Sequence, residues 1–226
     1  MQADSQCVQD VMKKKIVIVD DHPLMRKGLS TVINQEPDLS VEGEAEDASK
    51  ALDMIETRKP DLVIVDISLP GIDGIELLSM IKMRFGDVVT LVVSMHDEAI
   101  FAERVLRAGA RGYIMKQEAL ENVLVAIRQV LDGKIFLSSN IATRIIEKLV
   151  DGKKQKTGYP IDILSNREFT VLQLIGQGFQ TKKIAEKLNI STKTVETYRL
   201  HIKEKLKLGS SKELMKYAIL WVQNNS

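Results

Sequence analysis

The sequence predicts two units of different fold class, a doubly wound α/β domain with a five-stranded parallel sheet and a small all-α domain after it. Short β-branched runs alternate with amphipathic stretches from residue 15 to about residue 131, and no strand pattern follows. The charge also changes sign near residue 150. Residues 1–150 carry 18 Lys and Arg against 24 Asp and Glu, whereas residues 151–226 carry 14 against 7. The basic end is therefore expected to meet a polyanion, a partner that the acidic end does not share.

Five runs of mostly apolar residues are typical of strands in a parallel sheet that is covered on both faces. They span residues 15–20, 39–43, 62–66, 88–94 and 112–115. The stretches between them carry apolar residues at helical spacing, such as Ala48, Leu52 and Ile55, as crossover helices require. In this fold class, ligands bind at the carboxyl ends of the strands, which is where a functional site is expected.

The composition excludes several classes of protein. The chain of 226 residues is 44% hydrophobic and 28% charged, which is ordinary for a globular protein. Its longest apolar runs are far shorter than the roughly 20 residues that a bilayer-spanning helix needs, and no signal-peptide pattern opens the chain. Cys7 is the single cysteine, so an intramolecular disulfide or cysteine-based zinc site is excluded. We expect a cytoplasmic protein without a membrane partner.

The pattern predicts four segments along the chain. Residues 1–14 are polar and aperiodic and are expected to be an unstructured extension. The α/β domain is expected over 15–131, a linker with a helix at 138–150 over 132–160, and the basic domain over 161–226. Met12 precedes Lys-Lys-Lys-Ile, so a translation start there is a hypothesis, which an intact mass matching all 226 residues would refute.

Polar side chains stand at the ends of four predicted strands. Asp20 and Asp21 end the first, Asp66 ends the third, Ser94 the fourth and Lys116 the fifth. Three carboxylates at one edge require a cation, and Mg²⁺ is the usual one. Taken singly, these residues are adequately explained as helix caps and solvated side chains. Together they suit phosphoryl transfer, in which a carboxylate is the nucleophile and Mg²⁺ and lysine offset the developing charge.

The same stretch resembles the receiver domain of two-component response regulators, over residues 15 to about 131. The motifs that carry the resemblance are Val-Ile-Val-Asp-Asp-His-Pro at 17–23, Asp-Ile-Ser-Leu-Pro-Gly-Ile-Asp-Gly at 66–74, Val-Ser at 93–94, and Ala-Gly-Ala-Arg-Gly-Tyr-Ile-Met-Lys at 108–116. The resemblance implies a flavodoxin-like sheet and a phosphorylated aspartate.

The resemblance also implies roles for individual residues. Asp66 would be the phosphoacceptor and would bind Mg²⁺ together with Asp21 and the backbone carbonyl of Ser68. Asp20 would help to hold the ion, partly through water. Ser68 and His96 occupy positions that tune the lifetime of the phosphorylated state in this family.

Ser94 and Tyr113 would form the switch pair of such a domain. The Ser94 hydroxyl would move toward a phosphoryl group on Asp66, and Tyr113 would turn inward to fill the space left behind. Lys116 would pair with the phosphoryl group. Gln117 follows this lysine where many receivers have proline, which weakens the case for a cis peptide bond there.

Helix patterns dominate the basic region. They span residues 165–175, 181–188, 191–206 and 210–222. Two of them begin with a capping-box pattern, Ser165 with Glu168 and Ser210 with Glu213. The second and third are separated by Asn189 and Ile190 only, which is the layout of a helix-turn-helix that places its second helix in the major groove.

The helix 191–206 has an apolar side and a mixed polar side. Together with the preceding helix, it offers the side chains expected to contact DNA, namely Lys182, Lys183, Lys193, Thr194, Glu196, Thr197, Arg199 and Lys203. The lysines and Arg199 suit phosphates, whereas Glu196, Thr197 and Arg199 suit base edges. The alternative interpretation is a solvated lysine face, the usual role of a charged run.

Residues 164–208 resemble the LuxR-type helix-turn-helix, through Leu-Ser-Asn-Arg-Glu-Phe, Lys-Lys-Ile-Ala, Ile-Ser, Thr-Val and Lys-Leu. Tyr198 stands where many members have histidine. A receiver followed by this domain is the layout of the NarL/FixJ subfamily. The resemblance implies that the last helix, with Trp221, supplies a dimer contact on DNA, although core packing also explains its apolar residues.

These patterns predict a DNA-binding transcription regulator that a sensor histidine kinase phosphorylates on Asp66 and that then dimerises. It would not be an enzyme, apart from its own phosphorylation and dephosphorylation at Asp66. One rival is a Mg²⁺-dependent phosphatase or phosphotransferase. The sequence has no Gly-x-x-x-x-Gly-Lys-Ser/Thr loop and only three histidines to support that activity. The other rival is a phosphorylation-independent DNA binder with a degenerate receiver, against which the intact acidic set argues.

Overall fold

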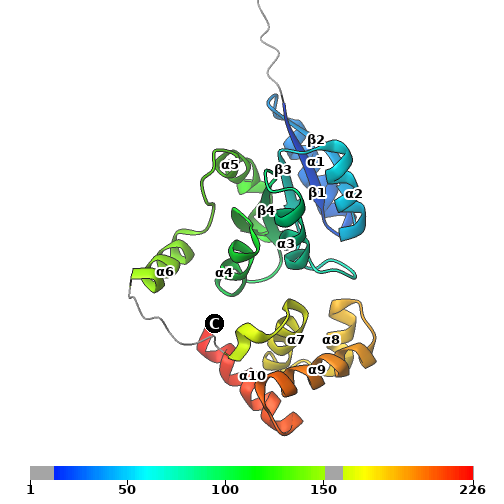
Figure 1. Ribbon diagram of the computed structural model, residues 1–226, viewed down its shortest axis with the longest axis vertical. Helices are drawn as coiled ribbons and strands as arrows, with labels where there is room; N and C mark the ends of the chain where they lie inside the picture. Colours follow the sequence, from blue (N-terminus) through cyan, green and yellow to red (C-terminus); the bar gives the residue numbers. More distant parts are fainter. Residues whose placement is uncertain (1–12, 151–159, 226) are drawn as a thin grey trace, which may run out of the picture.

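The computed structural model describes residues 13–150 and 160–225. The expectations for the extension at 1–12 and for the loop at 151–159 lie outside these residues. Figure 1 shows an α/β unit joined through a single helix to a helical unit below it. Among the described helices, none combines the length and the apolar character that a bilayer crossing requires.

The α/β unit contains the predicted five-stranded parallel sheet, in the order β2-β1-β3-β4-β5. The strands are β1 (Lys14–Val19), β2 (Leu39–Ala45), β3 (Leu62–Val65), β4 (Val89–Ser94) and β5 (Gly112–Met115). Two of the four strand ends that carry the predicted site, those of β1 and β3, lie one residue before the expected ones. As a result, Asp20 and Asp66 lie just beyond their strands rather than within them, whereas Lys116 directly follows β5, whose bounds match the expected ones.

Helices cover both faces of the sheet (Figure 1). They are α1 (Pro23–Asn34), α2 (Ala48–Arg58), α3 (Gly74–Arg84), α4 (Glu98–Ala108) and α5 (Ala119–Leu131), with a short 3₁₀ turn, η1 (Lys116–Glu118), before α5. Alternate strand residues point to opposite faces. Ile16 and Ile18 pack with α1 and α5, whereas Val17 and Val19 pack with α2, α3 and α4. This two-sided burial explains why the strands read as continuous apolar runs.

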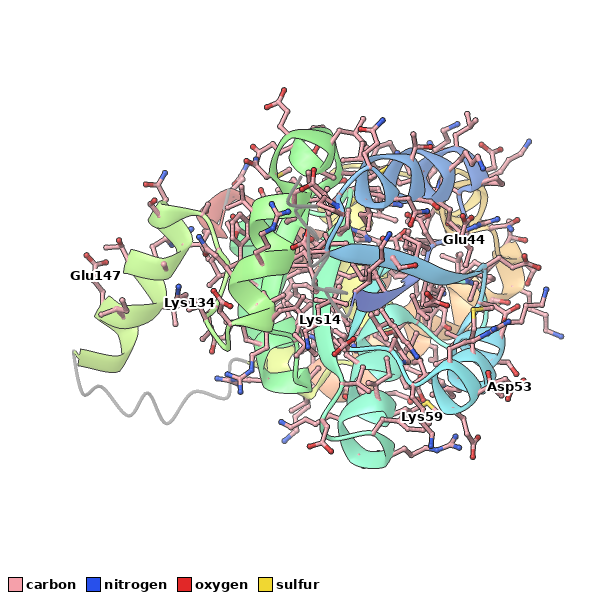
Figure 2. The ribbon with its side chains drawn as sticks, turned by 90° about the horizontal axis from the view of Figure 1, so that it is seen from above. Lys14, Glu44, Asp53, Lys59, Lys134 and Glu147 are labelled. Carbon is pink, nitrogen blue, oxygen red and sulfur yellow. The ribbon has the colours of Figure 1, made fainter. Side chains whose placement is uncertain are left out.

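The helix that follows the sheet domain, α6 (Ser139–Val150), contacts α4. Ile141 is buried, and the backbone N–H of Ser138 donates to Glu98 Oε1 at 2.8 Å. Figure 2 shows α6 beside the sheet domain, with the labelled Glu147 on its outer side. The helix is therefore held at its start by contacts with α4.

The basic unit is helical, as predicted. It consists of the 3₁₀ turn η2 (Pro160–Ile163) and the helices α7 (Asn166–Gly176), α8 (Thr181–Leu188), α9 (Thr192–Leu206) and α10 (Ser211–Asn225). Its core includes Phe169, Val195, Ile202 and Leu214. α7 and α10 pack so closely at Gly176 that a side chain there would not fit. A Cβ on Gly176 would lie 2.4 Å from the Ala218 carbonyl oxygen.

The two predicted capping patterns differ in the structure. Ser165 and Glu168 form a complete capping box on α7. At α10, the Ser210 hydroxyl accepts from the Glu213 N–H at 3.2 Å, but the Glu213 carboxylate takes the N–H of Gly209 at 2.9 Å. In the second motif the serine still caps the helix, but the glutamate binds the backbone N–H of the residue before the serine.

Candidate functional site

The sheet order brings the acidic residues together. β1 and β3 are neighbours, with Val19 paired to Val65. The residues that follow the two strands therefore lie at the same edge of the sheet. The Asp66 N–H donates to the Val19 carbonyl at 2.8 Å, which fixes the two strand ends relative to each other. Ligand atoms of Asp20, Asp21, His22 and Asp66 all lie within 4.8 Å of one another. The expected convergence of the three carboxylates at this edge is therefore present.

Two carboxylate oxygens in this cluster are buried without a hydrogen-bond partner. They are Oδ1 of Asp66, a residue that is 2% exposed, and Oδ1 of Asp21. Buried polar atoms are nearly always paired, so each such atom requires an explanation. A set of close carboxylate oxygens with unused lone pairs fits a hard divalent cation such as Mg²⁺.

Lys116 supplies a positive charge within the cluster. Its Nζ lies 2.7 Å from Asp20 Oδ2 and 2.8 Å from Asp66 Oδ2, and its side chain is 6% exposed. Burial opposes the charged form, but the charge of Asp66 and the hydrogen bonds to both carboxylates outweigh it and raise the pKa of Lys116. The lysine is therefore a fixed cation that holds one oxygen of Asp66 and leaves the other free.

His22 is a member of the cluster that the sequence pattern did not single out. Its Nδ1 lies 3.1 Å from Asp20 Oδ1 and 2.6 Å from Asp21 Oδ1, and its backbone N–H donates to Asp20 Oδ1 at 2.8 Å. The contact with Asp21 lies outside hydrogen-bond geometry. Its position directly after the aspartate pair was the available signal. The imidazole, whose side chain is 61% exposed, adds a polar contact on the solvent side of the cluster.

The predicted switch pair is buried. Ser94 is 0% exposed and Tyr113 is 1% exposed, so the tyrosine ring is already in the inward position. Its hydroxyl donates to the His96 carbonyl at 2.7 Å, and the His96 N–H donates to Ser94 Oγ at 3.3 Å. Burial raises the pKa of Tyr113, which therefore stays protonated. Hence His96 links the two switch residues.

Ser68 and His96 are in contact. Ser68 Oγ lies 3.0 Å from His96 Nε2. Burial lowers the pKa of His96, which favours the neutral ring at neutral pH. A neutral imidazole has one donor and one acceptor nitrogen and can pair with a hydroxyl in either sense. The predicted role of the Ser68 carbonyl in metal binding stays a prediction.

The predicted DNA-contacting residues lie on α8 and α9, which a short turn connects. Asn189 ends α8 in the left-handed conformation, with φ 51°, which lets α9 start three residues later. Lys182, Lys183, Lys193, Glu196 and Thr197 are exposed, whereas Thr194, Arg199 and Lys203 are partly buried. In Figure 1, α9 lies on the side of the helical unit that faces away from α4. The polar face of α9 is therefore accessible in this arrangement.

Two residues in this set make local contacts that the pattern did not predict. The Thr194 hydroxyl lies 2.8 Å from Ser191 Oγ at the start of α9. The Arg199 side chain is only 14% exposed and lies beside Glu196, Nε to Oε2 3.7 Å. Glu196 in turn accepts from Thr181 Oγ1 at 2.7 Å. Two of the three expected base readers thus hold each other in place before any DNA is bound.

Comparison with known proteins identifies both units. A family model described as "Response regulator receiver domain" matches residues 16–128. A second model, described as "Bacterial regulatory proteins, luxR family", matches residues 162–218. These ranges contain the acidic cluster and the α8–α9 pair, respectively.

Curated relatives align with almost the whole chain. The chain is 39% identical over 209 residues to "Oxygen regulatory protein NreC" of Staphylococcus haemolyticus, covering 91% of this chain and 96% of the relative. The Staphylococcus aureus protein of that name matches equally, at 39% over 209 residues.

Solved structures agree with these matches. A Salmonella typhimurium RcsB response regulator has 27% identity and a TM-score of 0.61, covering 93% of this chain and 98% of that one. A LuxR-family response regulator from Aurantimonas sp. SI85-9A1 has 36% identity and a TM-score of 0.56, over 61% of this chain and 99% of its own. With both domain models matched and relatives aligned from end to end, the chain belongs to the NarL/FixJ subfamily of two-component response regulators, phosphorylation-dependent transcription regulators that join a receiver domain to a LuxR-type DNA-binding domain.

Proposed function

We propose that this regulator accepts one phosphoryl group on Asp66 and that phosphorylation promotes dimerisation and DNA binding through α8 and α9. The observation that carries the proposal is the state of the Asp66 carboxylate. It is buried, Lys116 Nζ lies 2.8 Å from Oδ2, and Oδ1 has no partner. A side chain held in one orientation with an unused oxygen is prepared for an incoming electrophile.

The chemistry follows from this arrangement. A carboxylate oxygen of Asp66 attacks the phosphorus of a phosphohistidine on a sensor kinase, or of a small acyl phosphate. The new O–P bond replaces the P–N or P–O bond to the donor, whose electron pair leaves with the imidazole or the carboxylate. Lys116 offsets negative charge on the transferred group and then pairs with it. Attack of water on the same phosphorus would return Asp66 and release inorganic phosphate.

Asp20, Asp21 and Asp66 are the side chains proposed to hold Mg²⁺, with the Ser68 carbonyl as a further ligand. When bound, Mg²⁺ neutralises charge on the phosphoryl oxygens. The protein's own contribution is to keep the carboxylates together, which the paired ends of β1 and β3 support. The buried Oδ1 of Asp66, which has no hydrogen-bond partner, also supports this assignment.

Incubation with acetyl phosphate and Mg²⁺ tests the proposal. We expect one acid-stable, base-labile phosphate per chain, absent from D66N and from samples treated with a chelator. D87N is the matched control, because Asp87 is an exposed carboxylate remote from the strand ends that form the pocket. Phosphate on D66N, or turnover of a separate phosphorylated substrate, would refute the proposed role and favour the enzyme alternative.

DNA and a second copy of the chain are the proposed partners of the phosphorylated form. RcsB of Salmonella enterica serovar Typhimurium, 29% identical with a TM-score of 0.58, was solved bound to promoter rprA in the presence of the phosphomimetic BeF₃⁻. By this similarity, phosphorylation should raise the mass of this chain in solution toward that of a dimer, and D66N should remain monomeric. An unchanged mass for a fully phosphorylated sample would contradict the proposed dimer.

A further inference from the structure

The receiver and the DNA-binding domain are in direct contact through α4. Arg104 on α4 lies over the ring of Phe169 on α7, with 3.9 Å from its Cζ to the ring centroid. Its guanidinium also donates to the carbonyl oxygens of Ile161, at 2.9 Å, and of Leu164, at 3.4 Å. One receiver side chain therefore binds both the ring and the backbone of the other domain.

A second set of contacts reaches the loop that follows Asp66. Arg167 donates to the Leu69 carbonyl, and Asn166 Nδ2 lies 3.5 Å from Asp73 Oδ1. Leu69 and Asp73 lie between β3 and α3. The DNA-binding domain thus contacts a segment that begins three residues after the proposed phosphoacceptor.

Aromatic rings connect the receiver site with the last helix. The His96 ring lies 4.7 Å from Phe101, Phe101 lies 5.4 Å from Phe169, and Phe169 lies 5.1 Å from Trp221 on α10, all between ring centroids. Phe101 and Phe169 are almost fully buried, at 0% and 2% exposure. Because buried rings are closely packed, a displacement of one ring must be accommodated by the next.

His96 is the point at which this row of rings meets the receiver site. Its N–H donates to Ser94, its carbonyl accepts from Tyr113, and its Nε2 is paired with Ser68 Oγ. All three partners are residues that the family resemblance associates with the phosphorylated state. A change in any of them alters a contact of His96.

We propose that His96 is the positioning residue that couples the phosphorylation state of Asp66 to the docking of the DNA-binding domain, through Phe101 and Phe169. The inference rests on the proposed phosphorylation of Asp66. When Ser94 turns toward the phosphoryl group, it leaves the His96 N–H, and the imidazole loses its fixed position between Ser68 and Phe101. The contact of Phe101 with Phe169 is then weakened, and the DNA-binding domain is released from α4.

Trp221 makes this coupling measurable, because it is the single tryptophan of the chain and packs on Phe169. In the full-length protein with Mg²⁺, beryllium fluoride should shift Trp221 emission to longer wavelength as the ring contact loosens. ¹⁹F NMR of bound beryllium fluoride reports occupancy of the receiver site independently. H96A should bind beryllium fluoride while its Trp221 emission no longer responds.

Thermodynamic reciprocity gives the stricter test. If receiver-site binding weakens the domain contact, then breaking the contact must strengthen binding by the same factor. R104A removes the main anchor without touching the acidic cluster, and we expect it to raise beryllium fluoride affinity by about fivefold or more. In an H96A background, R104A should have no such effect, as a double-mutant cycle on coupled residues requires.

The outcomes separate the two proposals. R107A is the control, because Arg107 is on the same helix but is 70% exposed and paired with Glu103, and it should behave as wild type. Absence of beryllium fluoride binding to the wild type would refute the proposed phosphorylation site itself. Binding with a silent Trp221, or an R104A effect that is undiminished in H96A, would overturn the role of His96 alone.

Discussion

The receiver pocket and the α9 surface differ in how their functional groups are held. In the pocket, Asp20, Asp66 and Lys116 are buried and fixed by backbone that follows packed strands. On α9, Lys193, Glu196 and Thr197 are exposed on one helix. A preorganised buried site depends on each member, whereas a phosphate-contacting surface distributes its binding energy over many contacts. Single substitutions should therefore have large effects in the pocket and graded effects on α9.

Removal of Lys116 should have the largest effect. K116M leaves Asp20 and Asp66 buried side by side without their cation, and loss of one partner from a buried ion pair costs about 3–5 kcal/mol. Urea unfolding without Mg²⁺ should show this loss in the free energy of unfolding, and Mg²⁺ should restore part of it. K27M, at an exposed lysine on α1, is the control. Equal stability of K116M and wild type without Mg²⁺ would show that the pocket tolerates unpaired carboxylates.

Arg199 tests a place where side chains on the α9 surface already contact each other, as they do in the receiver site. Its side chain is 14% exposed and contacts Glu196, so R199A removes a base reader and also releases its neighbour. A well-placed arginine contact to guanine is worth about 1–3 kcal/mol of base discrimination. We expect R199A to lower affinity for a selected operator more than for unrelated DNA, as measured by fluorescence anisotropy. An equal loss on both DNAs would place Arg199 among the phosphate contacts instead.

The difference between the two regions also explains what the sequence could predict. The pocket was predictable because parallel strands place their carboxyl ends at one edge, so Asp21, Asp66 and Lys116 converge through topology alone. The helices of the second domain were predictable from periodicity and capping. The local contacts of Arg199 and Thr194 were not, because they depend on side-chain rotamers.

The contact between the domains left no signal in the sequence. Phe101 and Phe169 each fit the apolar side of an amphipathic helix, and such residues are usually explained by the core of their own domain. Arg104 is likewise an ordinary polar position in a helix pattern. That these three residues meet depends on how the two domains dock, and no periodicity encodes this relation.

Glu168 is a buried, ion-paired carboxylate in the helical domain, as Asp66 is in the receiver site. It should make the stability of the helical domain depend on pH. Burial opposes its charge, but hydrogen bonds from Lys205 and from the start of α7 lower the pKa of Glu168. Its stabilising contribution is therefore complete above the ordinary glutamate pKa and is lost as pH falls through the lower folded value. At pH 7, E168Q should lower the free energy of unfolding by about 1 kcal/mol. The difference in free energy of unfolding between E168Q and wild type should disappear in acid. A difference that does not change with pH would mean that the charge of Glu168 contributes nothing.

Substitution of Lys193 should have the smallest effect on DNA affinity. It tests directly whether the α9 surface distributes its binding energy over many phosphate contacts. This lysine is exposed at the start of α9, and Lys193 with one DNA phosphate would make a contact that contributes about −0.9 to the slope of log affinity against log salt. K193A should reduce that slope by about one and weaken operator and unrelated DNA alike. Titrations at several salt concentrations measure both quantities, with K27M as the matched lysine control. If the slope is unchanged while specificity falls, Lys193 reads bases, and the α9 surface is more like the pocket than its exposure indicates.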